Sequence, residues 1–293
     1  MTKTAWVFPG QGSQAIGMGM DLLELPDARA KFEQAESVLG WSVIDVCQSQ
    51  DSKVSHTLYT QPCLYVVEII LADLLKAKGQ HPDCVAGHSL GEYSALYAAG
   101  VFGFEDGLRL IKRRAELMDS ASDGMMAALI GFNRPNLEAA IAQTPDVVLA
   151  NDNNEGQVVI SGTPEAVEIV LNQIKTKRSI RLNVSGAFHS PLMADAATQF
   201  KTVLDSVPFT AAQVPVLSNV DPIPSTDPAV LKDRLDRQMT SSVRWREISL
   251  QLLQEGVDRV IEVGPGKVLT GIIKRNCPNL RLENIGSLAD FSS

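Results

Sequence analysis

A serine framed by two glycines is the residue of this sequence best suited to nucleophilic chemistry. Ser89 lies in the pattern Gly87-x-Ser89-x-Gly91, between a short apolar segment that predicts a strand and a stretch that predicts a helix. This context is typical of a nucleophile elbow, a sharp turn that exposes the serine hydroxyl while the glycines avoid clashes with neighbouring backbone. An ordinary turn serine is the alternative interpretation, and the strand–turn–helix context argues against it.

A serine nucleophile needs a base, and the sequence has four histidines that could provide one. His88 adjoins the serine, and neighbouring side chains on a tight turn diverge, so we expect a structural role for it. His56 and His81 lie in polar connections and are expected to face solvent. His189 follows an apolar, glycine-containing segment. We therefore predict that His189 is the base, with a satisfied core histidine as the alternative.

Two glycine-rich turns could present backbone N–H groups to an anion. Residues 8–14 read Phe-Pro-Gly-Gln-Gly-Ser-Gln after the first predicted strand, where such a turn can donate to an oxyanion. The same turn partly matches a dinucleotide-binding fingerprint, but that fingerprint needs a second strand ending in an acid about 20 residues later. Residues 28–39 predict a helix instead. Residues 264–267 match only part of a phosphate-binding loop and are interpreted as the turn that begins a helix.

An arginine on a predicted helix is the candidate for binding an anionic substrate. The helix covers residues 105–119, and Arg114 lies four residues from both Leu110 and Met118, which mark its apolar face. A guanidinium on that face needs a partner, because an unpaired buried charge is costly. A structural ion pair and a substrate carboxylate held by two hydrogen bonds are both compatible with this position.

The order of predicted elements favours a large α/β domain built on a parallel sheet. Short apolar runs predict strands at residues 4–8, 83–86, 214–217, 257–262 and 281–285. Helical periodicity predicts helices at residues 28–39, 62–78, 92–99, 105–119, 228–239, 245–255 and 267–274. With the elbow after the second strand, the expected architecture is α/β-hydrolase-like.

One stretch of the chain has a different pattern. Its predicted strands are residues 125–131, 147–151, 157–161 and 180–184, and its predicted helices are residues 137–143 and 164–175. The resulting β-α-β-β-α-β order is typical of a small ferredoxin-like unit. We therefore predict a small ferredoxin-like domain at residues 123–187, inserted into a discontinuous large catalytic domain at residues 1–122 and 188–293.

Composition narrows the range of partners. The chain has 293 residues, with 26 Lys and Arg against 34 Asp and Glu, which gives a net charge of −8. This balance argues against nucleic-acid binding. No membrane span is predicted, because the most apolar stretch is interrupted by Glu68 and Asp73. The four cysteines lack metal-ligand spacing, so no metal is expected, and reduced thiols favour a cytoplasmic protein.

Seven segments, in order over nearly the whole chain, form a joint pattern. They are residues 8–14, 60–62 (Thr-Gln-Pro), 87–92 (Gly-His-Ser-Leu-Gly-Glu), Arg114 with Met118, 157–162 (Gln-Val-Val-Ile-Ser-Gly), 188–193 (Phe-His-Ser-Pro-Leu-Met) and 262–269 (Glu-Val-Gly-Pro-Gly-Lys-Val-Leu). In this pattern the chain resembles the bacterial malonyl-CoA:acyl-carrier-protein transacylases of fatty acid synthesis. One departure is Ser241-Ser242-Val243, where the family often has Asn-Pro before the valine.

The resemblance implies transfer of a malonyl group from malonyl-CoA to the phosphopantetheine thiol of acyl carrier protein. It makes Ser89 the acylated nucleophile and His189 its base, and it assigns Arg114 to the malonyl carboxylate. It implies no metal and no bound cofactor, with malonyl-CoA as substrate and acyl carrier protein as partner. We further expect a monomer.

The resemblance also implies supporting residues. Backbone N–H groups of Gln11 and Leu90 would form the oxyanion hole. The backbone carbonyl of Gln238 would orient the base, in place of an acidic side chain. Gln61 and Asn153 would line the substrate pocket.

Two other functions are alternatives. A serine esterase or thioesterase of α/β-hydrolase type shares the Gly-x-Ser-x-Gly pattern, but it needs an Asp or Glu between the serine and the histidine and usually an HGGG-type motif. No acid between them stands in a distinctive context, and HGGG is absent. A non-catalytic module that binds carrier protein is disfavoured by the presence of both Ser89 and His189.

Overall fold

A parallel sheet forms the centre of the larger part of the molecule. The computed structural model describes residues 2–184 and 186–292, and within them the sheet has five strands. These are β1 (Thr4–Phe8), β2 (Cys84–Gly87), β7 (Val216–Leu217), β8 (Arg259–Val263) and β9 (Arg281–Ile285). They lie in the order β7-β2-β1-β8-β9, and every neighbouring pair is parallel. Their carboxyl ends therefore meet along one edge, where ligands bind in open sheets of this kind.

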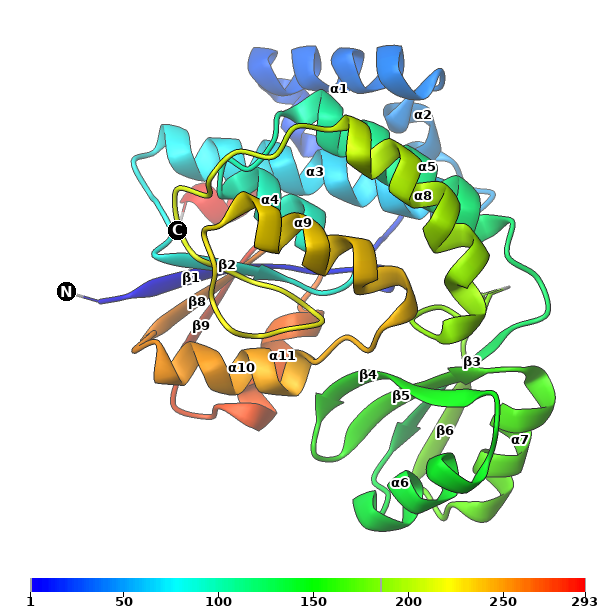
Figure 1. Ribbon diagram of the computed structural model, residues 1–293. Coiled ribbons are helices and arrows are strands. Elements are labelled where there is room, and N and C mark those ends of the chain that lie inside the picture. The colour runs from blue at the N-terminus through cyan, green and yellow to red at the C-terminus, as the bar shows by residue number, and fades with distance from the viewer. Residues whose placement is uncertain (1, 185, 293) are drawn as a thin grey trace.

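Helices cover both faces of this sheet (Figure 1). One face carries α3 (Thr57–Ala77), α4 (Gly91–Ala98) and α5 (Phe104–Asp119), and the other carries α10 (Trp245–Gln254) and α11 (Val268–Asn276). Alternation along β1 builds the two cores: Trp6 and Phe8 join the first, and Ala5 and Val7 join the second. Because both faces are buried, the inner strands β1 and β2 are nearly continuous apolar runs.

Further helices surround this core. They are α1 (Pro26–Leu39), α2 (Val43–Gln48), α8 (Ala194–Ser206) and α9 (Pro228–Arg237). Both α1 and α8 pack against α5 (Figure 1). The start of α9 is fixed by Asp227, whose side chain accepts hydrogen bonds from the backbone N–H groups of Ala229 and Val230.

Among the described residues, α3 is long and apolar enough to cross a membrane by length and composition, but 78% of the relevant 18-residue window is buried inside the fold. Burial on nearly all sides accounts for its apolar surface. Its predicted start at residue 62 is wrong, because the helix begins at Thr57. Pro62 lies inside the helix, where it has no N–H to donate to the carbonyl four residues earlier.

A second, antiparallel sheet is formed by residues between 125 and 181. Its strands are β3 (Met125–Ile130), β4 (Val147–Asn154), β5 (Gln157–Gly162) and β6 (Arg178–Arg181), in the order β4-β5-β3-β6. Two helices, α6 (Arg134–Gln143) and α7 (Pro164–Gln173), share a separate core with this sheet (Figure 1). The predicted β-α-β-β-α-β order is confirmed.

The chain leaves the parallel-sheet part and returns to it at neighbouring points. A Cβ atom built on Gly124 would lie only 2.0 Å from the backbone nitrogen of Ala187. The two connecting segments are therefore in direct backbone contact. The domain limits at residues 123 and 187 remain a prediction.

Several element predictions differ from the structure. Strand β6 covers Arg178–Arg181 rather than the predicted residues 180–184, and Leu182 and Val184 line a cavity instead. The helix predicted for residues 228–239 ends at Arg237 and continues as a 3-10 turn, Gln238–Thr240. Helices α2 and α8 were not predicted. α2 has only six residues, and α8 buries only a narrow stripe along its length.

Candidate active site

The turn between β2 and α4 holds Ser89 in the strained backbone conformation of a nucleophile elbow. Its φ angle is 52°, in the left-handed region. A Cβ atom on Gly87 would lie 1.9 Å from the backbone of Gly91, and one on Gly91 would lie 2.0 Å from the carbonyl oxygen of Phe8. Close packing of β1, β2 and α4 therefore requires a glycine at both positions.

Asn219 fixes the backbone of the elbow from the neighbouring strand. The backbone N–H of Ser89 donates to Asn219 Oδ1 at 2.7 Å, and Asn219 Nδ2 donates to the carbonyl oxygen of Gly87 at 2.6 Å. Asn219 is fully buried and follows β7 at the carboxyl edge of the sheet. Sequence reasoning missed this residue. The signal was a polar Ser-Asn pair directly after a predicted strand.

His189 meets the serine hydroxyl. Its Nε2 atom lies 2.7 Å from Ser89 Oγ, and its Nδ1 atom lies 3.0 Å from the backbone carbonyl oxygen of Gln238. Because a carbonyl oxygen only accepts, Nδ1 carries the ring proton and Nε2 is free to accept the hydroxyl proton. The structure thus brings together two residues that lie 100 positions apart.

Burial keeps the His189 ring neutral. The residue is 4% exposed, and its pKa is lowered from 6.5 to about 3, mainly by the loss of hydration. The nearby Arg114 cation contributes to this lowering of the pKa, and the hydrogen bond to Gln238 partly opposes it. At neutral pH the ring is therefore an uncharged acceptor, which is the form that a general base needs.

Arg114 lies beside this pair and is 1% exposed. Its Nη2 atom donates to Ser89 Oγ at 3.0 Å and to Gln238 Oε1 at 3.1 Å, and its Nη1 atom donates to Gln61 Oε1 at 2.7 Å. The guanidinium also lies 5.5 Å from the ring centroid of Tyr93. Among the described residues, no carboxylate lies within 4 Å of its nitrogens. A structural ion pair is therefore not what holds this buried cation.

A buried carboxylate holds the Gln238 side chain. Gln238 Nε2 donates to Glu92 Oε2 at 2.7 Å and to the backbone oxygen of Ser89 at 2.9 Å. Glu92 Oε2 also accepts the backbone N–H of Asn219 at 3.2 Å. Burial raises the pKa of Glu92, and the donated hydrogen bonds oppose that shift. Sequence reasoning used Glu92 only as part of a motif, although its place three residues after the serine was a signal.

A small cavity of about 90 Å³ lies at the serine–histidine pair. It is lined by Gln11, Gln61, His88, Ser89, Leu90, Arg114, Met118, Met126, Asn151, Leu182, Val184, Phe188 and His189. Since one water takes up about 30 Å³ of the liquid, this space suits a short acyl group. The turn after β1 closes one side of it, because a Cβ atom on Gly10 would lie 2.5 Å from the backbone oxygen of His88.

Asn153 was expected to line the substrate pocket, and this expectation is wrong, because Asn153 is not among the residues that line this cavity. Its Oδ1 atom lies 2.9 Å from His88 Nε2 instead. The pairing of β4 with β5 shifts register on either side of Asn151 and Asp152. Such bulges interrupt the in–out alternation of a strand, and Asn151 takes the place on the cavity wall. His88 is therefore engaged by Asn153, whereas His56 and His81 are exposed.

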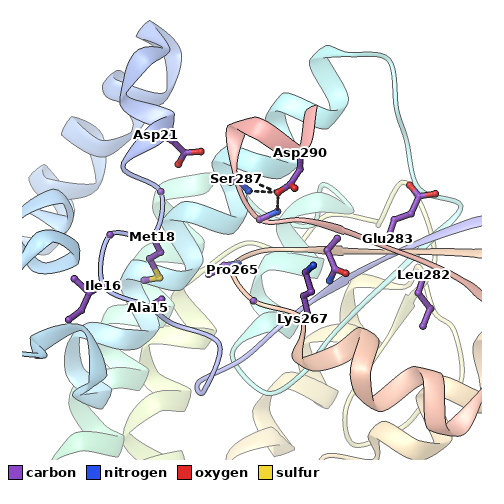
Figure 2. A pocket seen from close by; sticks show the side chains of 15 residues that line it. Ala15, Ile16, Met18, Asp21, Pro265, Lys267, Leu282, Glu283, Ser287 and Asp290 are labelled. Carbon is purple, nitrogen blue, oxygen red and sulfur yellow. Dashed lines mark hydrogen bonds between the residues drawn. The ribbon is translucent and has the colours of Figure 1, made fainter. Parts of the chain in front are cut away.

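A larger cavity of about 540 Å³ lies beside the loop that follows β1 (Figure 2). Its walls are the loop with Ile16 and Met18, the turn with Pro265 and Lys267, and the segment with Ser287 after β9. The Ser287 hydroxyl donates to Asp290, and no histidine is among the lining residues. This cavity therefore offers no nucleophile–base pair.

No group of three or more His, Cys, Asp or Glu side chains is arranged to hold a metal ion in the part of the chain that the structure describes. The four cysteines are all buried free thiols.

Comparison with known proteins identifies the family of the chain. Residues 5–286 match the model of the acyl transferase domain family. A malonyl CoA-acyl carrier protein transacylase of Synechocystis sp. PCC 6803 is 57% identical over 99% of both chains. The crystal structure of malonyl-CoA:ACP transacylase from that organism has a TM-score of 0.97 over 99% of both chains, at 57% identity.

A second solved structure contains a partner. It holds a type II PKS acyl-carrier protein in complex with its malonyl-transacylase, and it matches 99% of this chain and 98% of the other with a TM-score of 0.93 at 35% identity. The family match and the near full-length likeness lead to one conclusion. This chain belongs to the acyl transferase domain family, in the group of the malonyl CoA-acyl carrier protein transacylases.

Proposed function

We propose that this protein transfers the malonyl group of malonyl-CoA to the phosphopantetheine thiol of acyl carrier protein through an acyl-serine intermediate. One observation carries the proposal: a serine, a neutral histidine and a buried arginine without a carboxylate partner meet at a cavity sized for a short acyl group. The names of the relatives support the substrates.

In the first half-reaction, Ser89 Oγ attacks the thioester carbonyl carbon while its proton moves to His189 Nε2. Backbone N–H groups of Gln11 and Leu90, both on the cavity wall, would donate to the oxyanion that forms. The carbon–sulfur bond then breaks. The thiolate of coenzyme A leaves and takes the proton back from His189, so that the ring is neutral again.

In the second half-reaction, the phosphopantetheine thiol gives its proton to His189 and its sulfur attacks the malonyl-serine carbonyl. The carbon–oxygen bond to Ser89 breaks, and the departing oxygen receives that proton. The products are a malonyl thioester of the carrier protein and the free enzyme. No step in this sequence uses a metal ion or a bound cofactor.

Arg114 accounts for the choice of acyl group. Its guanidinium can pair with the free carboxylate of malonate, and Arg–carboxylate pairs are strong, charge-assisted contacts. An acetyl group offers no such partner and leaves a buried cation unpaired. Gln61 holds Nη1 of this guanidinium and would orient it toward the substrate.

An esterase is the alternative chemistry for a serine–histidine pair. In that class an Asp or Glu side chain faces the second ring nitrogen, whereas here a backbone carbonyl does so. The chain's buried, unpaired cysteines suit a reducing compartment, and we propose a cytoplasmic location on that ground.

Intact-mass analysis tests the proposal. After incubation with malonyl-CoA, we expect one malonyl adduct on the wild-type protein and none on Ser89→Ala. Adding carrier protein that bears a reduced phosphopantetheine thiol should remove the adduct from the enzyme and give malonyl carrier protein. Clearance at the same rate by water alone would instead assign the protein as a hydrolase, and absence of any adduct would refute the proposal.

A further inference from the structure

The hydrogen bonds of the Arg114 guanidinium can be counted nitrogen by nitrogen. Nη2 has two N–H bonds, and both are used: one donates to Ser89 Oγ at 3.0 Å and one to Gln238 Oε1 at 3.1 Å. Nη1 donates to Gln61 Oε1. Among the described residues, no acceptor bonds to Nε. The spare donors are therefore on Nη1 and Nε and not on Nη2.

This arrangement conflicts with bidentate binding of a carboxylate. A planar guanidinium holds a carboxylate through two parallel N–H bonds on one edge. Each such edge, Nη1–Nη2 or Nε–Nη2, includes an N–H of Nη2. A substrate carboxylate gripped in this way must therefore displace either Ser89 Oγ or Gln238 Oε1.

The Gln238 amide is the partner that stays. Its Nε2 end is tied to the buried Glu92 carboxylate at 2.7 Å and to the backbone oxygen of Ser89 at 2.9 Å, so turning the amide breaks both bonds. The hydroxyl of Ser89 moves by rotation about a single side-chain bond. The carboxylate therefore displaces Ser89 Oγ.

Loss of that contact makes the hydroxyl a better nucleophile. One lone pair of Ser89 Oγ accepts from a cation in the substrate-free enzyme, which withdraws electron density from the attacking atom. The same cation helps to lower the pKa of His189, so neutralising it also strengthens the base. In a malonyl thioester, two carbon–carbon bonds of about 1.5 Å each join the carboxylate carbon to the attacked carbon. This short link brings the carboxylate close to Nη2 when Oγ reaches the thioester.

We propose that Arg114 restrains Ser89 in the substrate-free enzyme and that the carboxylate of the incoming acyl group releases it. This inference rests on the proposed malonyl transfer. It makes the substrate carboxylate an activator of the nucleophile as well as a binding group. Discrimination against acetyl thioesters is then expressed in the acylation rate constant at saturating substrate, beyond any difference in affinity.

Supplying the substrate in two pieces tests this coupling. Acetyl-CoA and formate together carry the thioester and the carboxylate of malonyl-CoA. At saturating acetyl-CoA, we expect formate to raise the single-turnover rate of acetyl-Ser89 formation by about tenfold or more, which is the lower end for one hydrogen bond to a charged group. The increase should saturate with formate. Formamide has the same shape and no charge, and it should have no effect.

Two variants locate the effect. In Arg114→Ala, acetyl-Ser89 formation should be insensitive to formate. In Arg113→Ala, stimulation should persist, because Arg113 bonds to Glu116 and Gln199 outside the cavity. Equal rates with formate and formamide in the wild-type protein, or inhibition by formate, would overturn the inference even if Arg114→Ala did not fold. A normal malonyl adduct in that case would leave the proposed function intact, whereas its absence would remove both.

Discussion

The two residues that react both have backbones in the left-handed region. The φ angle is 52° at Ser89 and 58° at His189. For a residue with a side chain this conformation costs about 1–2 kcal/mol, and it persists only where the surroundings enforce it. At Ser89 the enforcing contacts come from Asn219 and Gln238, on the backbone N–H and the backbone oxygen. The strain aims the hydroxyl and the imidazole at each other.

The pH dependence of acylation should reflect the low pKa of His189. The base is active when deprotonated, so a pKa of about 3 moves the acid limb well below the usual histidine value of 6.5. We expect kcat/KM for CoA release from malonyl-CoA to stay level from pH 8 down to about pH 5. A profile that falls by half near pH 6.5 would contradict a buried, neutral base in the free enzyme.

Replacing Arg114 should change the preference between acyl groups. Each hydrogen bond from a charged group contributes about 1.5–3 kcal/mol, so loss of two bonds in Arg114→Ala should lower kcat/KM for malonyl-CoA by about 100-fold or more. Acetyl-CoA should gain relative to malonyl-CoA. The ratio of the two substrates cancels any change in the folded fraction. An unchanged ratio would remove Arg114 from substrate selection, and Arg113→Ala is the matched control.

At this scale, the reacting side chains could be predicted, whereas two of the residues that support them could not. Ser89, His189 and Arg114 each carry a local signal in the sequence. The serine lies between two glycines, the histidine has no other role assigned, and the arginine lies on the apolar face of a helix. Asn219 and Glu92 are ordinary polar residues in sequence. Their importance comes from bonds to Ser89 and Gln238 across as many as 146 positions, which only the folded chain reveals.

At the scale of elements, the strand–turn–helix unit depends on close backbone contact between the start of α4 and the end of β1. Gly91 begins α4 directly against the end of β1, and a methyl group there would overlap the carbonyl oxygen of Phe8. Gly271 also lies in a helix, α11, but a Cβ atom there would meet no atom within 4 Å. Comparing alanine substitutions at these two glycines therefore separates the effect of close packing on stability from the effect of helix propensity.

Substituting each by alanine should have opposite effects on stability. Gly91→Ala should lower the free energy of unfolding by about 3 kcal/mol, as overpacking against backbone does, and should abolish acylation. Gly271→Ala should raise the free energy of unfolding by about 0.5–1 kcal/mol, because alanine favours a helix. Urea denaturation measures both. Equal effects of the two substitutions would show that the elbow does not need its close contact.

Elements with strong periodicity were predictable, and those defined by tertiary context were not. Strand β9 was predicted with the bounds it has, whereas α8 was missed because its buried residues are only Phe200 and Leu204. The bulges of β4 leave no sequence signal, so Asn153 was expected in the cavity when Asn151 lies there. Such features follow from tertiary contacts, here the bridge between Asn151 and Val243.

At the scale of the whole molecule, charge distribution bears on how a carrier protein docks, and the family resemblance implies that this partner is acidic. The net charge is −8, so docking requires a local basic surface. Lys274 and Arg275 are exposed at the end of α11. The next residue, Asn276, donates to the backbone oxygen of Asn153, whose side chain contacts His88 on the cavity wall. Arg181, at the end of β6, is also basic, but it is already paired with Glu168.

Charge reversal tests this surface. Lys274→Glu should raise KM for carrier protein by about tenfold and weaken its dependence on salt, since rim charges act mainly on association. Lys201→Glu is the control, because it makes the same change of net charge at a residue on α8 that pairs with Asp205 and Asp236. Similar KM values for both variants would dismiss the α11 end as the docking site.

The contact between Gly124 and Ala187 has an evolutionary consequence. Because the excursion that carries the antiparallel sheet starts and ends at touching backbones, recombination could exchange it between relatives without separating Ser89 from His189. The exchanged piece would bring its own Met126, Asn151 and Val184, which form one wall of the cavity. Chimeras joined at the contact between Gly124 and Ala187 offer a direct route to acyltransferases that keep the same nucleophile and have a new acyl preference.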